Sequence, residues 1–197
     1  MWKNLGLDLA AHDMLLEVLG KGYQDIYLAQ KDRPEGMGYF DFVLSEVHGL
    51  RIKELMDEKA AGRKVIGSFC VFVPEEIVRA ADATLVGLCT GADFATEEVE
   101  KILPRNTCSL IKSAFGFKLA KVCPYIESAD MIVGENTCDG KKKSYEILKG
   151  LAPNLYVMDL PQMKSPEGRT LLQAEYFRFK EAIEELTGVT IDAERLK

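Results

Sequence analysis

Long apolar runs and leader signals are both missing from this chain of 197 residues. No apolar stretch approaches the roughly 18–20 residues that a membrane helix requires, which argues against a membrane-spanning segment. The N-terminal residues carry acidic side chains within their apolar stretch and contain no A-x-A cleavage site, so they do not resemble a secretory signal. We therefore expect a cytoplasmic protein.

An excess of positive charge is missing too. Lys and Arg number 25 against 31 Asp and Glu, which gives a net charge of −6 and a pI near 5.1. An acidic domain is a poor electrostatic match for nucleic acid or an anionic membrane surface. The chain also has neither a Walker A run nor a G-x-G-x-x-G loop, so we do not expect it to bind ATP itself.

Closely paired cysteines are absent, although the chain has five cysteines. The odd number excludes a complete disulfide framework, and no C-x-x-C pair occurs, which disfavours zinc ribbons and thioredoxin-type redox centres. A single cysteine is most often a small buried hydrophobic residue, and that alternative stands for each one. A shared metal site would need a fold that gathers thiols from separate loops. The five are Cys70, Cys89, Cys108, Cys123 and Cys138.

The periodicity of apolar residues changes near residue 64. Residues 1–63 read as a helical segment, in which the first helix ends at the Gly-Lys-Gly of residues 20–22. Short apolar runs then alternate with helices. This alternation predicts an α/β fold with a parallel, Rossmann- or flavodoxin-like sheet of about four strands behind the helical lead-in. The predicted strands are 64–69, 84–88, 131–134 and 154–158, and the predicted later helices are 96–103, 109–122, 141–148 and 168–186.

The cysteines fall at the ends of these predicted elements. Cys70 and Cys89 follow the first two strands, and Cys138 lies shortly past the third. Because the carboxyl ends of parallel strands form the ligand-binding edge of an open sheet, three thiols are expected there. Cys108 and Cys138 also begin helices, where free N–H groups favour the thiolate that binds soft metals. Cys123 ends the helix that Cys108 begins. These positions favour a shared metal or cluster.

The segments around the cysteines match a known family. They resemble the 2-hydroxyacyl-CoA dehydratase D-component and benzoyl-CoA reductase family. The five cysteines and the Thr-Cys-Asp-Gly-Lys-Lys-Lys run are most similar to its double-cubane cluster proteins. The matching segments are GSFCVFVPEE at 67–76, VGLC at 86–89, PRNTCSLIKS at 104–113 and GENTCDGKKK at 134–143.

The resemblance implies iron–sulfur chemistry. Cysteines like Cys70 and Cys108 help to hold a [4Fe–4S] cluster in dehydratase subunits, and all five thiols become expected metal ligands. A double-cubane [8Fe–9S] cluster needs six thiolates, so a second α/β domain would supply another ligand. Lys141, Lys142 and Lys143 begin a predicted helix and form either a solvated face or a set of charges that offsets an anionic cluster or an acyl-CoA phosphate; Lys141 and Lys142 are the candidate cofactor-binding residues.

The resemblance also implies a domain plan. We expect a helical lead-in over residues 1–63 and a cluster-binding α/β domain over 64–188. Residues 189–197 would start a second α/β domain, so that the chain represents an N-terminal half with the C-terminal half missing.

Three functions follow as expectations. The first is an ATP-dependent, low-potential iron–sulfur reductase component that receives electrons from a separate ATP-hydrolysing activator protein. The second is a 2-hydroxyacyl-CoA dehydratase subunit that eliminates water through a ketyl radical. The third is a non-catalytic α/β fragment. In the first two, the chain is expected to form a homodimer or to pair with a related subunit.

Overall fold

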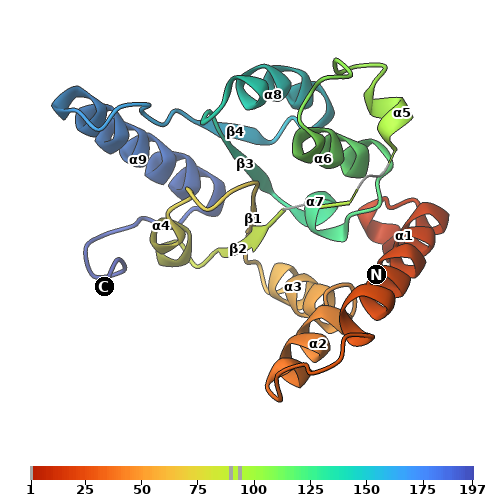
Figure 1. Ribbon diagram of the computed structural model, residues 1–197. Coiled ribbons are helices and arrows are strands. Elements are labelled where there is room, and N and C mark those ends of the chain that lie inside the picture. Colours follow the sequence, from red (N-terminus) through yellow and green to blue (C-terminus); the bar gives the residue numbers. More distant parts are fainter. Residues whose placement is uncertain (1, 89–90, 93–94) are drawn as a thin grey trace.

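The computed structural model describes residues 2–88, 91–92 and 95–197 (Figure 1). A four-stranded sheet with the order β2-β1-β3-β4 lies at its centre, and every neighbouring pair is parallel. This arrangement confirms the predicted α/β fold and the parallel sheet. The strands differ from their predicted bounds by at most one residue: β1 (Val65–Ser68), β2 (Thr84–Gly87), β3 (Met131–Glu135) and β4 (Leu155–Met158).

Helices cover both faces of the sheet and bury two apolar cores. The strand β3 contributes to both, because successive side chains of a strand point to opposite faces. Ile132 packs with the helices α6 and α8, and Val133 packs with α4 and α9. The bounds of these helices are Glu75–Ala80 for α4, Ser109–Leu119 for α6, Asp139–Leu151 for α8 and Pro166–Thr187 for α9.

The last helix, α9, has clear local signals at both ends. The Ser165 hydroxyl accepts a hydrogen bond from the Gly168 amide at 3.1 Å, and Gly188 ends the helix in the left-handed conformation. Residues 189–197 then pack back against the same face of the sheet, where Ile191 is buried. Arg195 donates to the Ala80 carbonyl at 3.0 Å. The expectation that a second domain starts at 189–197 stays a prediction.

The N-terminal helices lie beside the sheet edge formed by β2 (Figure 1). Leu15, Ile52 and Leu55 are buried and anchor this lead-in to the body. The elements are η1 (Trp2–Leu5), α1 (Leu9–Tyr23), η2 (Gln24–Leu28), α2 (Met37–Ser45) and α3 (Leu50–Ala60).

The predicted end of the first helix is wrong. The helix continues through Gly20 and Gly22 to Tyr23 and passes directly into the π-helical turn η2. Each glycine costs a helix only about 1 kcal/mol, and such a cost ends a helix only when no better conformation is stabilised. An ion pair at 2.8 Å between Lys21 and Asp25, one turn apart, supports the continuation.

Two later helices also depart from the prediction. The helix α5 (Thr96–Val99) is shorter than the predicted 96–103, and α6 ends before Val122, close to Lys121 with its positive φ of 51°. The sequence reading missed α7 (Pro124–Ser128), although proline at the first helical position is a usual helix start. None of the helices in the described part of the chain combines the length and apolar character that crossing a bilayer requires.

Candidate functional site

The sheet has one topological switch point, between β1 and β3. The chain leaves β1 toward β2 on one side, and β3 lies on the other side. In open α/β sheets, ligands bind outside the carboxyl ends of the strands at such a point. Cys70 follows β1 by two residues, and Cys138 follows β3 by three. Both thiols therefore lie where the topology alone would place a site.

Two helix N-termini face the same edge. Cys108 is the N-cap residue of α6, and Cys138 is the N-cap residue of α8. The Cys138 Sγ accepts a hydrogen bond from the Lys141 amide at 3.4 Å. Both cysteines are exposed, whereas Cys70 is half-buried. The free N–H groups of two helix N-termini therefore lie next to these two cysteines.

A buried carboxylate lies beneath the thiols. Glu135, the last residue of β3, is only 2% exposed and forms an ion pair with Lys141 from the first turn of α8. The Thr137 hydroxyl donates to its Oε1 at 3.0 Å, and the Tyr145 hydroxyl lies 3.4 Å from its Oε2. The Tyr145 ring fits here because residue 134 is a glycine, since a Cβ there would overlap the ring. These contacts fix the Lys141 ammonium in place.

The environment of Lys141 connects this ion pair to the cysteines. Burial disfavours the charged ammonium, but the hydrogen bond and charge of Glu135, with the Cys70 and Cys138 thiols nearby, raise the pKa of Lys141 above its ordinary value. Lys141 therefore holds a positive charge beside two of the predicted ligands. The neighbouring Lys142 is exposed and points away, so the structure separates the two lysines that the sequence grouped together.

Cys123 lies beyond the C-terminal end of α6, the helix that begins after Cys108. It follows α6 and caps α7, so the length of α6, about 16 Å at 1.5 Å per residue, separates it from Cys108. It is buried in the core, and burial raises the pKa of its thiol to about 11. A ligand role for Cys123 beside the other thiols would need movement of the α6–α7 segment.

The cysteine thiols are the chemical type of ligand that binds an iron–sulfur cluster. Cys89 lies outside the described residues. Among the described ones, no three His, Cys, Asp or Glu side chains are close enough to hold a single metal ion. A cubane makes a weaker demand, because it has four irons and each thiolate binds a different one. Thiol donors are the ligands that such a cluster takes, and the two helix N-termini and the Lys141 ammonium would offset part of its negative charge.

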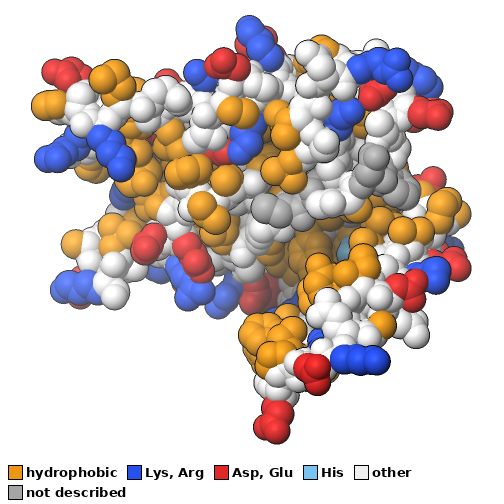
Figure 2. Space-filling view, in the orientation of Figure 1, with side chains coloured by type: hydrophobic (Ala, Val, Ile, Leu, Met, Phe, Trp, Pro, Cys, Tyr) orange, Lys and Arg blue, Asp and Glu red, His pale blue; other side chains and the backbone are white. Residues whose placement is uncertain are grey.

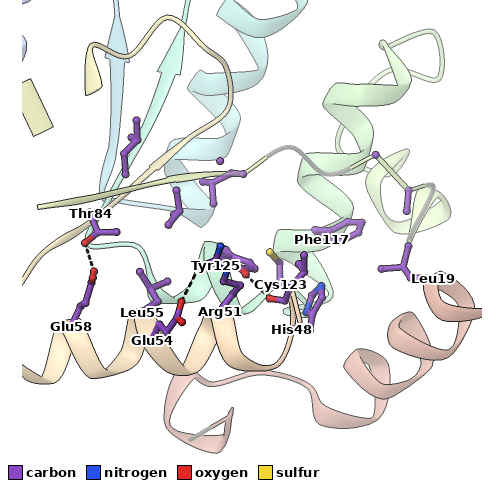
Figure 3. A pocket seen from close by; sticks show the side chains of 17 residues that line it. Leu19, His48, Arg51, Glu54, Leu55, Glu58, Thr84, Phe117, Cys123 and Tyr125 are labelled. Atoms are coloured by element: carbon purple, nitrogen blue, oxygen red, sulfur yellow. Dashed lines mark hydrogen bonds and ion pairs between the residues drawn. The ribbon is translucent and has the colours of Figure 1, made fainter. Parts of the chain in front are cut away.

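A separate cavity of about 770 Å³ opens between α3 and the free edge of β2 (Figure 3). Thr84, Leu85 and Val86 line it from the strand, and Tyr125 lines it from α7. The His48 ring forms part of the wall, 6.2 Å from the Tyr125 ring and 5.2 Å from the His12 ring between centroids. The Nδ1 atom of His48 is buried without a hydrogen-bond partner. No sequence signal pointed to this environment, because both histidines are isolated from any motif.

The burial of His48 predicts an acid-sensitive fold. Burial, with a smaller contribution from His12, lowers the pKa of His48 to about 4. In the unfolded chain, His48 binds a proton near pH 6.5. The free energy of unfolding is therefore not affected by this group above pH 6.5 and decreases as the pH falls from 6.5 toward 4. Between pH 7 and pH 5 we expect a loss of about 1 kcal/mol, allowing for solvent screening at this half-buried ring.

Urea unfolding at the two pH values measures this loss. The His48→Leu variant removes the titrating group and should lose about 1 kcal/mol less than the wild type over the same interval. An equal pH dependence in both proteins would contradict the assignment to His48.

Comparison with known proteins identifies the family of this chain. Residues 70–197, from the first of the cysteines onward, match the family model described as 2-hydroxyglutaryl-CoA dehydratase, D-component. The chain is similar to the "Putative dehydratase subunit YjiM" of Escherichia coli (strain K12), with 43% identity over 154 residues. The alignment covers 78% of this chain and 40% of the relative, so the chain spans about two fifths of that relative's length. The chain belongs to the 2-hydroxyglutaryl-CoA dehydratase D-component family.

Proposed function

We propose that this chain is an iron–sulfur electron-transfer component of the dehydratase family, of the double-cubane reductase type. Cys70, Cys108 and Cys138 would hold the cluster together with Cys89. The observation that carries the proposal is that Cys70 and Cys138 follow the two strands at the topological switch point, with the Lys141 ammonium held close to both thiols. When bound, the cluster would supply one-electron transfer at low potential.

The residues of the chain would tune the site rather than carry out bond chemistry. The Lys141 ammonium offsets part of the negative charge of the thiolates, and Glu135 holds that ammonium in place. The Lys141 amide stabilises the Cys138 sulfur by a hydrogen bond. Charge and hydrogen bonds at sulfur are among the factors that set the potential of a cluster.

The source of the electron would be a separate protein. The sequence has no nucleotide-binding loop, so ATP hydrolysis would belong to an activator. Cys108 and Cys138 are exposed, which would leave the edge of the sheet open to such a partner. We propose this activator as an iron–sulfur protein that docks at the carboxyl edge.

A second candidate is a 2-hydroxyacyl-CoA dehydratase subunit. The family description and the relative's name favour it. A small apolar cavity of about 40 Å³, lined by Phe69, Phe115, Lys141 and Tyr145, favours the reductase, because its size suits a small molecule better than an acyl chain.

Iron and sulfide analysis after anaerobic reconstitution tests the proposal. We expect about four irons per chain for a single cubane and up to about eight for the double cubane. Turnover that requires a CoA thioester would favour the dehydratase, and reduction of small unsaturated molecules without CoA would favour the reductase. A folded chain that binds neither iron nor sulfide would leave the non-catalytic α/β fragment as the correct function.

A further inference from the structure

The approach to Cys108 is an irregular segment. Residues 100–108, all described, connect α5 to α6 by turns rather than by a regular helix or strand. The Thr107 amide donates to the Pro104 carbonyl at 2.9 Å, and Leu103 is the only buried residue of this loop. A functional side chain on a loop is held less precisely than one on a helix or strand, unless other contacts fix the loop. The position of Cys108 therefore depends on what holds residues 100–108.

Lys112, in the first turn of α6, reaches back along this loop. Its amide donates to the Cys108 carbonyl at 3.0 Å, as expected for residues four apart in a helix. Its Nζ atom donates to Glu100 Oε1 at 3.0 Å and to the Arg105 carbonyl at 3.2 Å. Helical side chains point toward the N-terminus of their helix, which gives Lys112 this reach. One side chain thus joins the start and the middle of the loop to the helix that follows Cys108.

The loop clamp, defined as Lys112 with Glu100 and the Arg105 carbonyl, is largely shielded from water. The side chains of Lys112 and Glu100 are 15% and 22% exposed, whereas that of Arg105, which also pairs with Glu100 at 3.1 Å, is 89% exposed. Exposed ion pairs contribute little, so Lys112 is the more important cation for Glu100. Its hydrogen bond is the main reason that the pKa of Glu100 lies below the ordinary value.

The next residue of α6 makes a similar contact. The Ser113 side chain is buried, and its hydroxyl donates to the Ala92 carbonyl at 2.6 Å. Neighbouring residues of α6 therefore bind the connection between β2 and α6 at two places, one at Ala92 and one at the loop clamp. Figure 2 shows acidic and basic side chains close together over α5 and the loop that follows it. The Lys-Ser pair that ends the PRNTCSLIKS segment thus anchors the part of the chain that leads to Cys108.

We propose that Lys112 is a positioning residue for Cys108, and that the loop clamp holds the thiol where a cluster can bind it. This inference rests on the proposed function, because it takes Cys108 as a ligand. Replacing a residue that orients a metal ligand typically changes metal affinity by about 10–100-fold. The competing explanation is that the Lys112 ammonium offsets the charge of the cluster directly, as proposed for Lys141. The two explanations differ in the role of Glu100.

Iron binding by variants of the two charged partners separates these explanations. The clamp requires both partners, so Lys112→Met and Glu100→Leu should each weaken iron binding about tenfold during anaerobic reconstitution. The double variant should lose no more than either single variant, because the clamp is already broken. A direct charge effect would act with opposite signs, since losing the ammonium would weaken binding of an anionic cluster and losing the carboxylate would strengthen it. Such opposite effects, or wild-type iron binding in both variants, would overturn the proposal.

Two control variants exclude a general effect of surface charge or of stability. Lys101→Met removes a 65% exposed lysine of the same loop and should bind iron like the wild type. Phe179→Leu, in the core beneath α9, should lower stability without changing iron affinity. The electron paramagnetic resonance spectrum of the reduced cluster should change in Lys112→Met and stay unchanged in Phe179→Leu. If Phe179→Leu lost as much iron as Lys112→Met, the effect would be one of stability and the proposal would be wrong.

Hydrogen exchange in the metal-free chain tests the clamp without a cluster. We expect the hydrogen-bonded Thr107 amide to exchange about tenfold faster in Lys112→Met and in Glu100→Leu than in the wild type, with no change in Lys101→Met. A wild type that binds no iron would contradict the proposed function, and this measurement would still decide whether the clamp holds the loop. Exchange at the wild-type rate in both clamp variants would overturn the inference whether or not iron binds.

Discussion

Replacing Lys141 with Met is expected to destabilise the protein by about 3 kcal/mol, because the substitution leaves Glu135 buried without its cation. The Glu135 side chain is only 3% exposed, so water cannot replace the ammonium. Removing one partner of a buried ion pair costs more than the pair itself contributes, since the remaining charge bears the full desolvation penalty. Urea unfolding of the metal-free protein measures the change.

Two further variants isolate the ion pair as the cause. Lys142→Met removes the same charge one residue away at an exposed position, and we expect it to change stability by less than about 0.5 kcal/mol. The double variant Lys141→Met with Glu135→Gln should recover most of the loss, because the neutral amide oxygen can still accept from the Thr137 hydroxyl while the amide NH2 group can donate to the Tyr145 hydroxyl. Equal losses for Lys141→Met and Lys142→Met would contradict the assignment.

The ion pair was within reach of the sequence but was not predicted from it. Lys141, Tyr145 and Leu148 are spaced at i, i+4 and i+7, so they lie on one face of α8. Because Tyr145 and Leu148 are apolar and buried, Lys141 had to point inward with them, while Lys142 points outward. A lysine on a buried face needs a carboxylate, and Glu135 at the end of the preceding strand was the available one.

The strands were predictable for a simple reason. A parallel strand buried on both faces is a short, almost continuous apolar run, and β1 with four buried residues is an example. The ends of such runs then located Cys70 and Cys138 at the carboxyl edge. Helix ends depended on weaker signals. The energies of Gly20 and Gly22 were too small to end α1, and the short α7 has too few residues to show a period.

The spacing of the cysteines in the sequence could not show that Cys108 is exposed and that Cys123 is buried in the core. Cys108 and Cys123 flank one predicted helix and look equivalent in the sequence. The structure distinguishes them because the first turn of α6 lies against the start of α8, where Ile111 approaches Gly140, whereas Cys123 follows the other end of α6. The direction of α6 relative to the strands is what places Cys108, rather than Cys123, nearer to the start of α8, and spacing in the sequence does not give that direction.

That division gives the prediction with the largest effect on cluster content. Single substitutions Cys70→Ser, Cys108→Ser and Cys138→Ser should each remove most of the reconstituted iron, because a hydroxyl is a poor replacement for a soft thiolate ligand. Cys123→Ala should keep the iron of the wild type, because its buried thiol, with a pKa of about 11, stays protonated and is about one α6 length away. Iron and sulfide analysis of the four variants provides the measurement.

The free energies of unfolding of the same variants, measured without metal, separate an effect on iron binding from an effect on folding. Cys123→Ala removes a buried side chain and should lower the free energy of unfolding by about 1 kcal/mol. The serine variants at the exposed Cys108 and Cys138 should leave the metal-free protein almost unchanged. Iron loss and stability loss are thus expected at different cysteines. If Cys123→Ala lost as much iron as Cys70→Ser, Cys123 would be a ligand as well, and the α6–α7 segment would have to move toward the switch point when the cluster binds.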